Sequence, residues 1–157
     1  MLLLAHVALS LYALLAGVFV VVGLCKGQRW PWWTATFLAS SIGTSASGYL
    51  FHSQTFGPPQ IVGVVSLVAL ALAAFALYVR GLTGPWRVTY VTMAVIAFYL
   101  NAFVGVVQAF DKVSFLHAFA PNGSGAVFAL AQVALLAIFA LVGWRAVQRF
   151  HPSVNRL

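Results

Sequence analysis

Few side chains in this 157-residue sequence are able to do chemistry. Asp111 is the only carboxylate side chain and Cys25 is the only thiol. A single carboxylate excludes catalysis by paired acids, and a single cysteine excludes both an intrachain disulfide and a multi-cysteine metal site. Cys25 ends an apolar run, which indicates an inert thiol at a helix end. No catalytic set of nucleophile, base and orienting acid follows from the spacing, so the sequence favours a protein that is not an enzyme.

Three histidines raise the question of a metal site, because neutral imidazole and carboxylate groups suit zinc or copper. His6, His52 and His117 are far apart in the sequence, and none of them forms an i, i+4 pair on one helix. They are weak metal candidates, and the sequence predicts no metal site. The residues also identify no cofactor.

Amide side chains form a clearer pattern. Asn101, Gly105, Gln108 and Lys112 fall on one narrow stripe of a helix at ~100° per residue. On a membrane helix, such amides either bond to a neighbouring helix or line a ligand site. Both interpretations stay open at this point.

Hydroxyl side chains recur at four-residue spacing between positions 40 and 49. The two stripes are Ser40, Thr44 and Gly48, and Ser41, Ser45 and Tyr49. Small residues at this spacing let helix backbones approach closely, and the alternative is a hydroxyl-lined pocket.

The neighbours Asp111 and Lys112 also allow two interpretations. Exposed at a helix end, they form an ion pair worth little. Alternatively, Asp111 is a proton or cation site, since it is the sole acid.

The elements that must position these residues follow from the composition. Charged residues make up 6% and hydrophobic residues 63% of the chain. A soluble domain has ~25% charged residues, and a disordered chain has low hydrophobicity, so both classes are excluded. The net charge of +7 is scattered rather than clustered, which argues against nucleic-acid binding. The sequence predicts an all-α polytopic membrane protein.

A membrane span needs ~20 mostly apolar residues. Four runs qualify clearly, and a fifth, rich in Ser and Thr, is marginal. The predicted spans, all in one membrane domain covering 1–157, are 2–24, 32–51, 61–79, 88–110 and 125–144.

Charge decides whether the marginal stretch 32–51 crosses. With five spans, one side of the membrane holds all basic residues except Lys112, a division of seven to one. Without that span the division is five to three. Because cytoplasmic loops collect Lys and Arg, we expect five spans, an outside N-terminus and a cytoplasmic C-terminus. All five tryptophans then lie at the cytoplasmic interface, which fits an aromatic belt.

This topology gathers the polar side chains on the outer side. The connection 111–124 between the fourth and fifth spans is apolar enough to lie as a short interfacial segment. The sequence therefore predicts an outward-facing polar pocket above a dry inner half. The candidate ligand-binding residues are Ser45, His52, Asn101, Gln108, Asp111, Lys112, His117 and Gln132.

Two stretches carry a resemblance. GTSASGYLF (43–51) and YLNAFVGVVQAFDKVSFLHAFAP (99–121) resemble stretches of short bacterial membrane proteins to which no function is assigned. The resemblance covers roughly Trp30 to Phe150 and brings no functional residues with it. It implies a bacterial inner membrane.

Three functions remain in competition. The first is a non-enzymatic protein that binds a small or lipophilic ligand or serves as an accessory subunit. The second is a proton- or cation-coupled transporter or channel that uses Asp111 and Lys112. The third is a redox protein with a periplasmic-side metal or quinone. The expected partners are membrane lipids, with a homo-oligomer or a larger membrane complex as further possibilities.

Overall fold

The computed structural model describes residues 1–49, 57–120 and 125–151, and this part of the chain is all helical. The helices are α1 Leu2–Cys25, α2 Pro31–Gly48, α3 Pro58–Ala74 with the π-helical turn η1 Phe75–Val79, α4 Trp86–Lys112, α5 Ser114–His117 and α6 Ala126–Arg149. The predicted all-α class is confirmed. The helices begin and end within a few residues of the predicted spans, except that α6 continues five residues past the expected end at Trp144.

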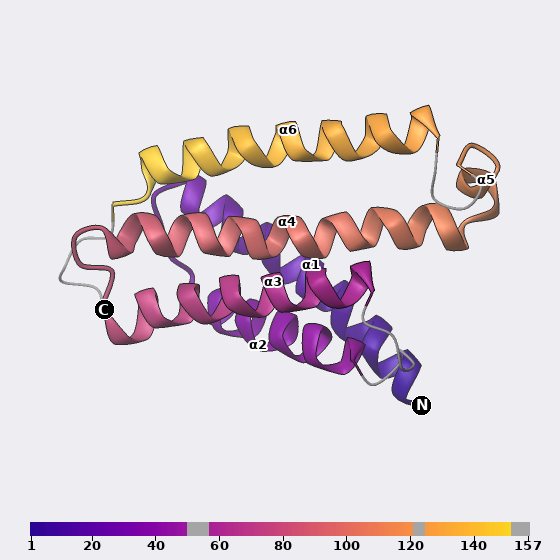
Figure 1. Ribbon diagram of the computed structural model, residues 1–157. Helices are drawn as coiled ribbons and strands as arrows, with labels where there is room; N and C mark the ends of the chain where they lie inside the picture. The colour runs from indigo at the N-terminus through magenta and orange to yellow at the C-terminus, as the bar shows by residue number, and fades with distance from the viewer. Residues whose placement is uncertain (50–56, 121–124, 152–157) are drawn as a thin grey trace.

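The five long helices form an antiparallel bundle in which α4 lies centrally (Figure 1). Helix α4 packs against α1, α3 and α6, while α2 packs against α1 and α3. Helix α1 runs obliquely behind the others, and α6 lies along one side of the bundle (Figure 1). The short connections 26–30 and 80–85 join neighbouring helices at the same end of the bundle.

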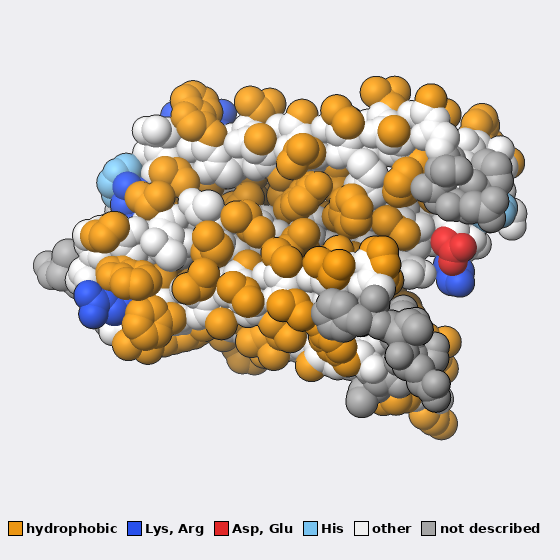
Figure 2. Space-filling view, in the orientation of Figure 1, with side chains coloured by type: hydrophobic (Ala, Val, Ile, Leu, Met, Phe, Trp, Pro, Cys, Tyr) orange, Lys and Arg blue, Asp and Glu red, His pale blue; other side chains and the backbone are white. Residues whose placement is uncertain are grey.

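Four of the helical segments are long and apolar enough to cross a membrane: Leu2–Cys25, Pro58–Val79, Trp86–Lys112 and Ala126–Arg149. Hydrophobic side chains cover most of the face seen in Figure 2. Such a surface suits a lipid environment rather than water. The chain therefore has the features of a multi-pass membrane helix bundle.

Helix α2 does not reach the same hydropathy, because hydroxyl residues and glycine fill much of its 18-residue length. It is nevertheless packed into the bundle, with Thr34, Phe37, Leu38, Ser40 and Ser41 buried. Neighbouring helices thus cover part of the polar surface that would be costly to expose to lipid.

Proline and glycine set the helix ends. Pro31 and Pro58 occupy the first turns of α2 and α3, where a missing backbone N–H is harmless. The Gly57 N–H donates to the Gln60 side-chain Oε1 at 2.9 Å, which caps the start of α3. Between η1 and α4, Gly81, Leu82 and Gly84 all adopt positive φ, which turns the chain sharply.

The hydrophobic core occupies one half of the bundle. We define the basic half as residues 13–40, 67–99 and 138–151, which contain the connections 26–30 and 80–85. The outer half comprises the described residues 1–12, 41–49, 57–66, 100–120 and 125–137. Among the described residues, every buried hydrophobic side chain except Phe110 and Ala120 belongs to the basic half. Its packing centres on aromatic residues such as Phe37, Tyr90 and Phe98.

Beyond α4, helix α5 consists of a single turn. Phe115 and Phe119, in and just after this turn, are exposed and their rings lie 5.1 Å apart. An exposed aromatic pair here fits the predicted interfacial segment, whose placement at a membrane surface stays a prediction.

Candidate functional site

Asn101 joins two helices of the bundle. Its Nδ2 group donates to the Ser41 hydroxyl at 2.8 Å, which ties α4 to α2. Ser41 is completely buried, and Asn101 is half-buried. This bond favours the interhelical interpretation of Asn101 and gives the hydroxyl stripe of α2 a partner on α4.

Gln132 makes a second interhelical contact at similar depth. Its Nε2 group donates to the Phe103 carbonyl at 3.3 Å, which ties α6 to α4. The Gln132 Oε1 atom is buried and has no hydrogen-bond partner among the described residues. Asn101 and Gln132 therefore bond to different neighbours, and Gln132 keeps one free acceptor.

His6 and α2 form the third polar contact of the outer half. His6 Nδ1 lies 2.7 Å from the Ser47 hydroxyl, joining α1 to the end of α2. Nearby on α2, Ser45 is half-buried, and the Thr44 hydroxyl oxygen is buried without a partner among the described residues. Polar groups thus lie between helices along most of the outer end of α2.

Tyr49 extends this polar region to α3. Its hydroxyl donates to the Gln60 carbonyl at 2.9 Å, just after the end of α2. The Tyr49 ring also fills the space beside Gly63, where an added Cβ would lie 3.1 Å from the hydroxyl oxygen.

The remaining candidates lie at the end of α4 and beyond it. Gln108, Asp111, Lys112 and His117 are all exposed. Lys112 Nζ lies 2.8 Å from Asp111 Oδ2, and the acidic and basic side chains meet on the molecular surface near the end of α4 (Figure 2). The structure thus brings Asp111 and Lys112 together as predicted by their sequence proximity, but leaves both in contact with solvent.

Among the described residues, no three His, Cys, Asp or Glu side chains lie close enough to hold a metal ion. His6 and His117 belong to different parts of the outer half. His52, the remaining metal and ligand candidate, lies outside the described residues.

The basic half contains a polar contact that residue spacing did not reveal. Arg87, at the start of α4, donates from one guanidinium nitrogen to the Val147 and Phe150 carbonyls at 2.8 and 2.6 Å. These are carbonyls at the C-terminal end of α6, where a cation is favoured. The sequence contains several scattered Arg residues, and their spacing does not indicate which one caps a distant helix.

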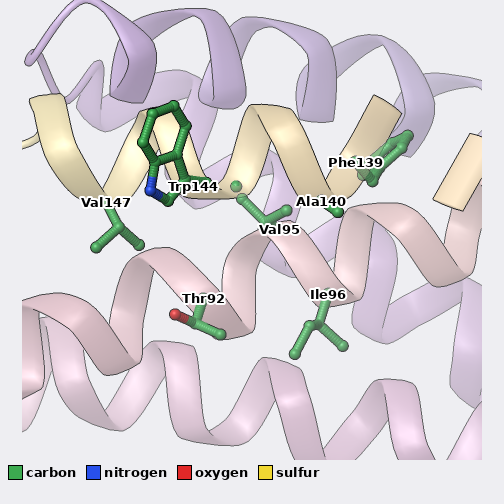
Figure 3. A pocket seen from close by; sticks show the side chains of 8 residues that line it. Thr92, Val95, Ile96, Phe139, Ala140, Trp144 and Val147 are labelled. Carbon is green, nitrogen blue, oxygen red and sulfur yellow. The ribbon is translucent and has the colours of Figure 1, made fainter. Parts of the chain in front are cut away.

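Sequence reasoning also missed a groove between α4 and α6 (Figure 3). It has a volume of about 320 Å³ and is lined mainly by apolar side chains, with Thr92 as its hydroxyl residue. It lies in the basic half, away from the predicted ligand-binding residues. The sequence signal for it is only the pair of small residues Ala140 and Gly143 on α6.

Searches with this chain find no matching protein-family model, no matching curated protein and no matching solved structure.

Proposed function

We propose that this chain is a five-span inner-membrane protein whose outer half binds a small or lipophilic ligand or a partner subunit, without catalysis. In this proposal α2 also crosses the membrane, which makes five spans. The N-terminus then faces outside and the C-terminus faces the cytoplasm. The exposed turn around α5 then rests at the outer membrane surface. The bacterial location rests on the sequence resemblance alone.

One observation carries the proposal: the same helices are packed tightly in one half and joined by sparse polar contacts in the other. Among the described residues, two buried oxygen atoms of the outer half lack hydrogen-bond partners, Thr44 Oγ1 and Gln132 Oε1, as does Tyr90 Oη in the basic half. A buried polar atom that lacks a partner costs roughly 1–3 kcal/mol, so a bound group that hydrogen-bonds to it would recover part of that cost. This supports binding from the outer side.

Transport through Asp111 and Lys112 is the alternative that the geometry supports less. The pair is 55% exposed at Asp111 and 73% exposed at Lys112, and its charges compensate each other. A pathway across the protein also needs polar groups through its full depth. In the basic half, Phe37, Val91, Ala94 and Phe98 are buried against one another instead.

The topology is tested by cysteine labelling in a Cys25→Ser background. Gln28 and Ser114 are both exposed and lie in connections on opposite sides of the proposed membrane. In right-side-out vesicles, Ser114→Cys should react with an impermeant thiol reagent, and Gln28→Cys should react only after permeabilisation. Labelling of both from outside would mean that α2 does not cross.

The binding region is tested by the same reagent at Ser45. Ser45→Cys should react from the outside within minutes, because water enters between the helices there. Ile42→Cys is the matched control. Ile42 lies one turn from Ser45 on α2, is 41% exposed, and faces lipid in this proposal. Equal lack of reaction at both positions would indicate tight helix packing without a site.

A further inference from the structure

The groove between α4 and α6 is a feature that the proposed outer-half function does not use. Its lining comes from Thr92, Val95 and Ile96 on α4 and from Phe139, Ala140, Gly143, Trp144 and Val147 on α6. Figure 3 shows Val95 of α4 pointing toward α6, whose Ala140 and Val147 lie on the side nearer α4. Residues 139–147 span about 12 Å of helix, all within the basic half.

The small residue Gly143 lets α6 approach α4 closely beneath this groove. An added Cβ at Gly143 would lie 3.2 Å from Val95 Cγ1, so the two helices touch at the floor of the groove. Contacts made by larger side chains lie at the two ends of the groove. Arg87 bonds to the carbonyls of Val147 and Phe150 at one end, and the Phe98 and Phe139 rings meet at 5.0 Å at the other.

Trp144 separates this groove from a second hollow. The second hollow measures about 230 Å³ and is lined by Leu141, Val142, Trp144 and Arg145. The Trp144 side chain is 68% exposed, and Arg145 beside it is exposed too. Two apolar hollows thus flank one indole ring, with a guanidinium group at the edge of one of them.

The charge of Arg145 is not balanced by an acidic side chain. Asp111 is the only Asp or Glu residue in the sequence, and it pairs with Lys112 at the opposite end of α4. A guanidinium group prefers a partner with two oxygens in a plane, such as a phosphate. At a membrane surface that partner is the headgroup of an anionic lipid.

We propose that this face is a binding site for one anionic phospholipid. One acyl chain lies in the α4–α6 groove, the second lies in the hollow across Trp144, and the phosphate bonds to Arg145. Charge complementarity selects a lipid over a neutral apolar helix, because a helix would leave the guanidinium without an anionic partner. This inference needs the membrane location, but it is independent of any binding in the outer half.

Native mass spectrometry of the purified full chain provides the test. Phosphatidylglycerol and phosphatidylcholine of equal chain length are titrated separately, and the first lipid bound is quantified. One anionic contact at a membrane surface contributes ~1 kcal/mol, so phosphatidylglycerol should bind about fivefold more tightly. Equal affinity for the two lipids would overturn the proposal.

Two variants locate the site. Arg145→Gln should remove the preference for phosphatidylglycerol, while Arg149→Gln, an exposed residue that lines neither hollow, should retain it. Ala140→Leu should fill the groove and weaken the binding of both lipids. Ala134→Leu, on an exposed part of α6 away from the groove, should leave binding unchanged. Equal losses in Arg145→Gln and Arg149→Gln would mean a diffuse basic surface and would also overturn the proposal. Neither Arg variant touches the outer half, so Ser45 labelling separates this failure from failure of the proposed function.

Discussion

The basic half and the outer half are built from the same five long helices but are held together differently. In the basic half, buried alanine, valine and aromatic side chains pack into one cluster, beside which the α4–α6 groove lies. In the outer half, single hydrogen bonds such as Asn101–Ser41 and His6–Ser47 join helices whose other side chains are largely exposed. Close packing gives the basic half its stability, whereas isolated polar contacts contribute less. The difference supports the proposal that a ligand or partner binds to the outer half.

Helix α4 shows the change within one element. Its first half buries Tyr90, Ala94 and Phe98, which repeat at four-residue spacing along one face. Its second half carries Asn101, Gly105 and Gln108 on one face, and only Phe110 is buried beyond residue 99. The same helix is thus a core element at one end and carries a polar stripe at the other.

The largest expected effect comes from overpacking the basic half. An added Cβ at Gly17 would lie 2.4 Å from the Phe98 ring, which the Phe37 and Phe139 rings hold in place. Gly17→Ala should lower the free energy of unfolding by about 3 kcal/mol, at the upper end of overpacking costs. Circular dichroism during unfolding by sodium dodecyl sulfate in mixed micelles measures this change.

Gly105→Ala is the matched control in the outer half. An added Cβ there makes only an ordinary contact, 3.5 Å from Leu14 Cδ1. Because alanine has a higher helix propensity than glycine, the variant should be neutral or more stable by up to ~1 kcal/mol. Similar destabilisation at Gly17 and Gly105 would contradict the difference between the halves.

The next effect comes from the cap on α6. Arg87→Gln should cost about 2 kcal/mol, because two charge-assisted hydrogen bonds to helix-end carbonyls are lost. Hydrogen exchange should then increase at residues 147–150. Arg149→Gln, which removes an equal but exposed charge, should leave exchange there unchanged; equal increases in both variants would refute the cap.

A smaller effect is expected in the outer half. A double-mutant cycle of Asn101→Ala and Ser41→Ala should give a coupling energy of ~0.6 to 1.7 kcal/mol, the range for hydrogen bonds between membrane helices. The unfolding assay used for Gly17 supplies the four free energies. A coupling energy near zero would mean that Asn101 does not bond to Ser41 in the membrane.

The smallest effect is expected at the exposed ion pair. Asp111→Asn should leave the free energy of unfolding nearly unchanged, because an exposed pair contributes little. Proton or cation flux in liposomes should also be unchanged. Loss of a measurable flux in this variant would restore the transport hypothesis.

The sequence predicted the helices well, because long apolar runs interrupted by glycine and proline determine where membrane helices begin and end. It left open whether Asn101 bonds to a neighbouring helix or lines a ligand site, and it named Gln132 only as a ligand-binding candidate. The partners Ser41 and Phe103 could not be predicted, since spacing along one helix says nothing about rotation relative to its neighbours. The α4–α6 groove was missed for the same reason, because it forms only where Ala140 and Gly143 of α6 meet Val95 of α4.

Hydrogen–deuterium exchange along α4 in lipid nanodiscs tests the contrast between the halves most directly. Amides from Asn101 to Phe110 should exchange markedly faster than amides from Tyr90 to Phe98, although both segments belong to one helix. Fast exchange requires water to enter the outer half, which the basic half excludes. Uniformly slow exchange along the whole of α4 would contradict the account.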